Sequence, residues 1–173
     1  MQDFLGDAAE AVAATFTVTY REGDKTTTLT QRPPDRRVEV VTGTSTEAVF
    51  RLRDGVFACK HEQGREWECG RTPSGGVDPD LGVFSADRLE ATAKALGDAR
   101  ASYDLSIKAG TVAGADVRCL VAAKKLGDGT GDELCIAASG AILRIRSAAV
   151  SVEAERYSAE VPAELFRLPA EPR

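Results

Sequence analysis

Apolar and polar residues alternate along most of the chain, and this period of two is typical of β-strands that bury one face. The alternation starts at Phe16, Val18 and Tyr20, which are separated by threonines, and returns at hairpin spacing between turn-forming pairs such as Ala113-Gly114. The expected strands centre on residues 16–20, 25–31, 38–40, 48–52, 56–60, 66–70, 103–107, 117–121, 134–138, 142–146 and 150–157. The pattern therefore predicts about ten or eleven short antiparallel strands.

Two segments carry apolar residues at helical spacing instead. Phe4, Leu5 and Val12 follow this spacing before the first strand. In the middle of the chain, Ser85 can cap a second helix that ends at Gly97. A passage rich in proline, glycine and aspartate precedes this second helix and divides the strands into two sets.

The expected architecture follows from this order of elements. Pairing of successive strands through short turns is the simplest topology, and a long antiparallel sheet twists and curls, so its concave face needs an apolar cover. We therefore expect an α+β fold that is mostly β: a curved antiparallel half-barrel sheet with an N-terminal helix and a mid-chain helix on its concave face. The length of 173 residues and the 43% apolar content suit a single domain over residues 1–173.

The four cysteines fall into two close pairs, Cys59 with Cys69 and Cys119 with Cys135. Each pair brackets a predicted turn, so its members would face each other across a hairpin. Neither pair has the C-x-x-C spacing of a zinc or redox motif, and His61 is the only histidine that could join a metal site. We predict two disulfides and no metal; the alternative is four reduced cysteines in the core of a cytosolic protein.

The composition limits the cellular compartments in which the protein can work and the classes of partner that it can bind. Disulfides would place the protein outside the cytosol, yet the residues after Met1 form neither a signal peptide nor a lipobox, so we expect a mature extracytoplasmic fragment, secreted or anchored to the cell envelope. No stretch approaches the roughly 20 apolar residues of a membrane span. A net charge of −5 opposes binding to nucleic acids. Abundant alanine, an excess of arginine over lysine and the absence of asparagine indicate a GC-rich bacterial genome.

Residue types that support catalysis are scarce. There is no G-x-S-x-G motif, and we interpret His61 as a surface residue near a hairpin tip. Glu62, Glu66 and Glu68 are close in sequence, but such acids on a hairpin are usually solvated. The glycine-rich run at 127–133 does not lead from a strand into a helix and lacks EF-hand spacing, so a flexible turn is favoured over a phosphate or calcium site. We predict a protein without enzymatic activity or cofactor.

The order of elements and three local stretches resemble a known family. The stretches are Thr15-Phe16-Thr17-Val18-Thr19-Tyr20, Arg32-Pro33-Pro34-Asp35-Arg36 and the ending from Val161 to Pro169. Together the layout resembles the LolA/LolB-like lipoprotein-carrier superfamily, which includes LppX/LprG-type lipoproteins of actinobacterial envelopes and the lipid-sensing domain of periplasmic sigma-factor regulators. The two hairpin disulfides depart from the carrier prototype, and they place the chain nearer an actinobacterial branch.

The resemblance implies a half-barrel whose lidded concave face holds a lipid, an acyl chain or an acylated protein, so that the domain acts as an envelope carrier or sensor. From strand parity we expect the following residues to line this cavity: Phe16, Val18, Leu29, Val38, Val40, Phe50, Leu52, Tyr103, Leu105 and Ile107 from strands, with Phe84, Leu89 and Leu96 from the lid. The alternative for each of these residues is ordinary packing in the core.

The alternative is a regulatory or protein-interaction domain without a lipid cargo. In that case an envelope protein would dock on a sheet edge or on the segment from Arg32 to Arg37. The arginines of this segment also suit protection of a strand edge against aggregation, which we favour. The sequence leaves the oligomeric state open.

Overall fold

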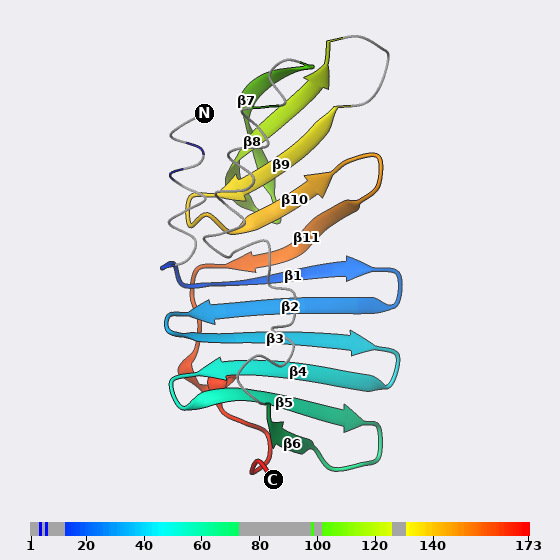
Figure 1. Ribbon diagram of the computed structural model, residues 1–173, viewed down its shortest axis with the longest axis vertical. Coiled ribbons are helices and arrows are strands. Elements are labelled where there is room, and N and C mark those ends of the chain that lie inside the picture. The colour runs from blue at the N-terminus through cyan, green and yellow to red at the C-terminus, as the bar shows by residue number, and fades with distance from the viewer. Residues whose placement is uncertain (1–3, 5, 7–12, 73–97, 99–101, 126–130) are drawn as a thin grey trace.

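The computed structural model describes residues 4, 6, 13–72, 98, 102–125 and 131–173, and it contains one open eleven-stranded antiparallel sheet (Figure 1). The strands are β1 (Phe16–Glu22), β2 (Lys25–Arg32), β3 (Asp35–Thr42), β4 (Ser45–Leu52), β5 (Gly55–Glu62), β6 (Glu68–Arg71), β7 (Tyr103–Val112), β8 (Ala115–Lys124), β9 (Asp132–Ala137), β10 (Ile142–Arg146) and β11 (Ser151–Ser158). A single 3-10 turn, η1 (Ala163–Phe166), follows the last strand. The mostly β prediction and the number of strands are confirmed. The two predicted helices are not seen, because almost all of their residues lie outside the described part of the chain.

The order of strands in the sheet is β6-β5-β4-β3-β2-β1-β11-β10-β9-β8-β7. Successive strands pair within each half, as predicted, but β6 and β7 follow one another in sequence and lie at opposite ends of the sheet. The reason is that β1 pairs with β11, so the first and last strands join the two meanders at the centre (Figure 1). Purely sequential pairing is therefore wrong at this one junction.

Tight turns set the hairpin registers. Gly23 and Gly43 have φ of 63° and 56°, in the left-handed region that favours glycine. Ala113 and Gly114 both have positive φ, 50° and 77°, which is the backbone of a type I′ turn whose twist matches that of the flanking strands. The β7–β8 register runs without a shift from Tyr103 to the turn.

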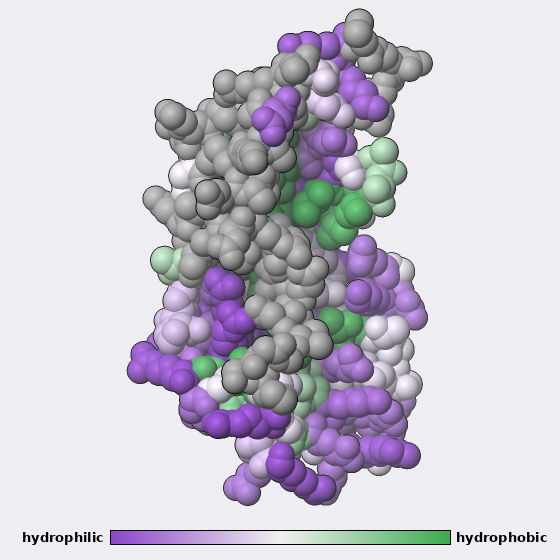
Figure 2. Space-filling view, viewed as in Figure 1, coloured by the Kyte–Doolittle hydropathy of each residue, from purple (hydrophilic) through white to green (hydrophobic). Residues whose placement is uncertain are grey.

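The register also assigns each side chain to one face of the sheet, because cross-strand partners share a face. Val18 pairs with Leu29, and Leu29 pairs with Val38. Across the β1–β11 junction the same face continues through the partner pairs Ile145–Leu134, Leu134–Leu120 and Leu120–Ile107. We call this the apolar face. Figure 2 shows hydrophobic residues beside the grey region in the middle of the molecule and mainly hydrophilic ones over the end that holds β4–β6.

The other face, here the opposite face, is covered on the first meander by the C-terminal segment. Ala48, Phe50, Phe57 and the cysteines of β5 and β6 form a buried cluster, against which Leu168 packs. Further along the chain, Arg173 donates its backbone N–H to the carbonyl of Cys69 at 3.0 Å, next to a parallel bridge between Cys69 and Pro172. The C-terminal segment thus buries an apolar cluster and also occupies the edge of β6.

Two disulfides link neighbouring strands. Cys59 bonds to Cys69 between β5 and β6, and Cys119 bonds to Cys135 between β8 and β9, in the cross-strand positions predicted from the sequence. All four cysteines are buried. Because each bridge joins strands that are already paired, it fixes the register of its hairpin.

A tyrosine locks the central junction of the two meanders. Tyr20 of β1 faces the small residue Ala154 of β11, and its hydroxyl donates a hydrogen bond of 2.5 Å to the carbonyl of Ile142 in β10. The ring thus spans β11, and burial raises the pKa of the Tyr20 hydroxyl far above its usual range. On the same face, Tyr157 of β11 donates a 2.9 Å hydrogen bond to the hydroxyl of Ser139.

Candidate functional site

Most of the described residues that we predicted to line a cavity lie on the apolar face. Phe16, Val18, Leu29, Val38 and Val40 occupy this face in the first meander, and Tyr103, Leu105 and Ile107 occupy it in the second. The first four are buried in the main core cluster, whereas the side chain of Ile107 is 39% exposed. The register thus brings the two groups onto one face, at different distances from the central junction.

The prediction for Phe50 and Leu52 is corrected, because the register places both residues on the opposite face. Val38 pairs with Val49, so the neighbouring residue Phe50 points the other way. There its ring contacts the guanidinium of Arg37, 5.3 Å from the ring centroid. The error arose because β4 has apolar residues on both of its faces. The predicted lid residues Phe84, Leu89 and Leu96 lie outside the described residues.

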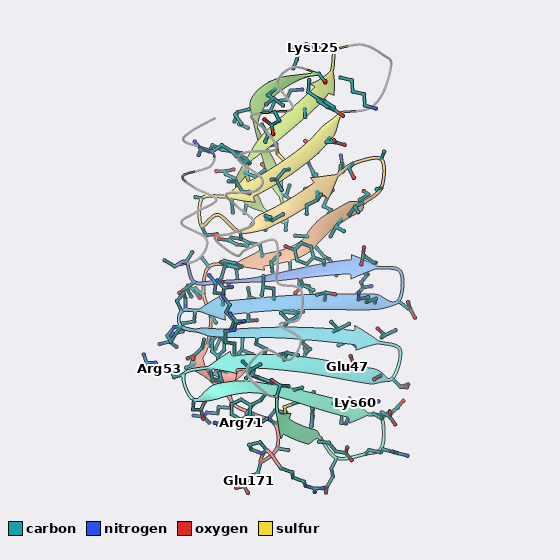
Figure 3. The ribbon with its side chains drawn as sticks, in the orientation of Figure 1. Glu47, Arg53, Lys60, Arg71, Lys125 and Glu171 are labelled. Carbon is teal, nitrogen blue, oxygen red and sulfur yellow. A yellow bond between two sulfur atoms is a disulfide. The ribbon has the colours of Figure 1, made fainter. Side chains whose placement is uncertain are left out.

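Two hollows lie at the ends of the sheet, and the first is lined mainly by residues of the apolar face. The first, of about 600 Å³, covers β4–β6 and is lined by Glu47, Val49, Ala58, Lys60, Glu68, Gly70 and Arg173, among others. Figure 3 shows the labelled Glu47 and Lys60 on the neighbouring strands β4 and β5. The second, of about 450 Å³, lies at β7–β9 over Ala109, Gly110, Val117 and Ala137. Small side chains make up most of the lining of the second hollow, whereas charged side chains also line the first.

Charged side chains on the opposite face of β9–β11 pair with one another. Arg144 forms a two-pronged hydrogen bond with Glu153, at 2.9 and 3.1 Å, and lies 3.7 Å from Glu133. Arg146 also binds Glu153, at 2.8 Å. The hydrogen bond from Arg144 lowers the pKa of Glu153, whereas desolvation opposes this shift. The hydrogen-bonding groups of these arginines and glutamates are engaged with one another. This arrangement suits cross-strand stabilisation more than acid-base chemistry.

The remaining chemical groups have structural partners. His61 stacks on Trp67 with ring centroids 5.1 Å apart, beside the Cys59–Cys69 disulfide. The side chains of Cys119, Glu133 and Cys135 come within 4.8 Å of one another, but the two sulfurs are bonded to each other and are not available as thiolate ligands. Among the described residues, no helix has the length and apolar character needed to cross a bilayer.

The predicted docking segment from Arg32 to Arg37 is divided between the two faces. Arg37 lies beneath the C-terminal segment, where it donates a 3.4 Å hydrogen bond to the carbonyl of Leu165 and pairs with Glu39. Arg36 points to the apolar face, opposite Gln31 and Arg51. The segment therefore cannot present its arginines together to one partner.

The sequence reasoning named a sheet edge as a possible docking site, but it did not identify β7 as that edge. β7 is the last strand of the sheet, and among the described elements it pairs only with β8. It has ten residues, no proline and no bulge, and most of its residues are exposed. The β6 edge at the other end has only four residues and is occupied by the C-terminal segment. Natural sheets usually shorten, bend or cover an edge strand, and in the described part of the chain this is seen at the β6 end and not along β7.

The hydrogen-bond pattern shows which β7 groups point outward. Lys125 donates its N–H to the carbonyl of Ser102 at 3.0 Å, so this pair belongs to the hydrogen-bonded class of the antiparallel ladder. The two classes alternate, and a hydrogen-bonded pair must also close the two-residue turn after Val112. The N–H and C=O groups that point away from β8 are therefore those of Tyr103, Leu105, Ile107, Ala109 and Thr111.

Comparisons with known proteins give a structural match only. No family model and no curated protein matches the sequence. Solved structures do. The fold is similar to that of MucB. A chain in the complex structure of Pseudomonas aeruginosa MucA/MucB superposes with a TM-score of 0.57 at 17% identity, covering 96% of this chain and 60% of that one. The crystal structure of MucB gives a TM-score of 0.54 at 16% identity, covering 96% of this chain and 62% of that one.

The similarity to MucB concerns the arrangement of the strands. At this identity it is a statement about the fold alone, and this chain spans about three-fifths of each MucB chain. The two disulfides are of the kind found in proteins of oxidising, extracytoplasmic compartments.

Proposed function

We propose that this chain is a non-catalytic, extracytoplasmic protein-interaction domain of the regulator type, which binds an extended segment of an envelope protein at the edge of β7. The open and regular β7 edge carries this proposal. In the solved complex, MucB is accompanied by MucA, and a partner of comparable kind is the natural candidate for this chain. This corresponds to the alternative stated from the sequence, in which a partner docks on a sheet edge or on the segment from Arg32 to Arg37, and we propose the sheet edge.

The physical basis is strand addition. An extended segment that pairs with a sheet edge gains main-chain hydrogen bonds from the edge, and its alternating side chains select the partner. The edge of β7 offers outward backbone groups at every second residue, and Ile107 adds an exposed apolar side chain on the apolar face. The segment would therefore present apolar residues toward the face of Leu105 and Ile107.

Co-precipitation from envelope extract of the source bacterium tests the proposal with two variants of one residue. Ile107→Pro removes an N–H that points away from β8, so it blocks the edge without breaking a β7–β8 hydrogen bond. Ile107→Thr is the matched control, because it shortens the side chain and keeps the N–H. We expect the partner to be lost with proline and retained with threonine, in proteins of similar melting temperature. Equal recovery with both variants would refute binding at this edge.

A second candidate is binding of a lipid, an acyl chain or an acylated protein, and the two hollows at the ends of the sheet favour it. Each methylene group removed from water contributes about 0.8 kcal/mol, so an acyl chain can bind without special polar contacts. Native mass spectrometry of gently purified protein, followed by solvent extraction, should then detect lipid. A protein that carries none and takes up no fluorescent fatty acid would argue against this function.

A further inference from the structure

We propose that two copies of this chain pair edge to edge through β7 around a twofold axis, so that their sheets form one continuous antiparallel sheet. This inference rests on the same edge as the proposed function. It names a second copy of the chain as the segment that occupies the edge when no other partner is bound.

The backbone restricts the possible registers. The outward groups belong to odd-numbered residues, so two β7 strands can exchange hydrogen bonds only when odd-numbered residues face odd-numbered residues. The even-numbered residues then form the non-hydrogen-bonded pairs, in which side chains on one face approach most closely. A twofold axis perpendicular to the sheet keeps the apolar face of one copy continuous with that of the other.

Side chains select one of these registers. With the axis at Ser106, Asp104 of each copy faces Lys108 of the other, and Leu105 faces Ile107 on the apolar face. The interface then contains two ion pairs and two apolar pairs from four side chains per copy. Asp104 and Lys108 are both exposed, and neither makes an ion pair with another described residue of its own chain.

The neighbouring registers lack this complementarity. With the axis at Ile107, Asp104 faces Gly110 and Lys108 faces Ser106. With the axis at Leu105, Asp104 faces Ser106 and Lys108 faces Ser102. Neither arrangement brings opposite charges together. The register at Ser106 is also centred away from Val112, which is buried within its own molecule.

Self-pairing would regulate the proposed function, because one edge cannot pair with two strands. A partner segment must then displace the second copy, so partner binding should convert dimers into one-to-one complexes. The affinity for the partner should also fall as the protein concentration rises.

Charge reversal tests the dimer, with analytical ultracentrifugation over a range of protein concentrations at low salt. Asp104→Lys places two Lys–Lys pairs across the axis and Lys108→Asp places two Asp–Asp pairs, so we expect each to weaken dimerisation about tenfold. The double variant D104K/K108D restores both ion pairs and should return to within about threefold of the unaltered chain. An equimolar mixture of the two single variants should form a heterodimer, since each copy then supplies the complementary charges.

The outcomes separate this inference from the proposed function. An unaltered chain that stays monomeric overturns the dimer, while co-precipitation with Ile107→Pro still decides the proposed function. Dimers that are equally stable in all charge variants overturn the register at Ser106. A dimer that survives Ile107→Pro overturns the use of β7. Failure of the single variants to form a heterodimer contradicts the twofold arrangement.

Discussion

Replacement of Tyr20 by phenylalanine should loosen the junction between the two meanders. The change keeps the ring and its packing over Ala154 and removes only the hydroxyl that binds the carbonyl of Ile142. Leaving a buried carbonyl without a hydrogen-bond partner lowers the free energy of unfolding by about 1–3 kcal/mol. For a domain of this length, a cost of about 2 kcal/mol corresponds to a fall in melting temperature of about 4–8 °C.

Thermal and urea denaturation followed by circular dichroism, with the disulfides intact, measure this effect. Tyr157→Phe is the matched control, because its hydroxyl binds the half-buried hydroxyl of Ser139 and not a backbone carbonyl. We expect this control to cost about 0.5–1 kcal/mol. If Tyr20→Phe costs no more than the control, the hydroxyl of Tyr20 does not hold the junction.

The same variant gives a pH test. Burial raises the pKa of Tyr20, so the folded protein keeps this proton at a pH where the unfolded chain releases it. The unfolded pKa is about 10. Stability from this group is therefore complete below about pH 10 and is lost above it, by up to about 1.4 kcal/mol per pH unit. Tyr20→Phe should show a shallower loss of stability at alkaline pH. Parallel curves for the two proteins would refute the shift.

Three further changes probe other parts of the sheet. Ala113→Asn should raise stability by about 0.5 kcal/mol in urea denaturation, because asparagine tolerates the positive φ of the β7–β8 turn better than alanine; a loss of stability would contradict this. Replacing both Cys119 and Cys135 by serine should cost about 3 kcal/mol, since the bridge closes a loop with a sequence separation of 16. Glu153→Gln should lower stability near neutral pH, because the hydrogen bond from Arg144 lowers the pKa of Glu153 and stabilises its ionised form. That difference should shrink as the pH falls through the lowered pKa. A difference that is constant between pH 7 and pH 3 would refute the role of the ionised carboxylate.

Local signals in the sequence were sufficient for the strands and their hairpins. Alternation from Phe16 to Tyr20 predicted β1, and the pair Ala113-Gly114 predicted the β7–β8 turn. The cysteine spacings predicted both cross-strand bridges, because a hairpin with a known turn fixes which residues face each other. These features depend on neighbours along the chain and on the period of two.

Features that depend on distant segments were not accessible in this way. The pairing of β1 with β11 leaves no local mark, so sequential pairing was extended too far. Phe50 was assigned to the wrong face because Ala48, Val49 and Phe50 are all apolar and the period of two is lost there. What buries Phe50 is a segment more than a hundred residues further along the chain, together with Arg37.

The sequence carries only a negative signal for the open edge of β7. Edge strands normally carry proline, a bulge or a dense set of charges, and residues 103–112 have only Asp104 and Lys108. Without the strand order, however, nothing distinguishes an edge strand from a central one. Recognition of the edge required the topology.

The meeting of the first and last strands has a consequence for how the chain acquires its structure. Each meander is built from contacts close in sequence and can form quickly, whereas the β1–β11 contact spans most of the polypeptide and must wait for it. Until β11 has been synthesised, the outer side of β1 is an unprotected strand that other molecules could join. For a protein made from its N-terminus onward, the β1–β11 pairing at the middle of the sheet thus forms last, and aggregation through the unpaired β1 is the main risk before it forms.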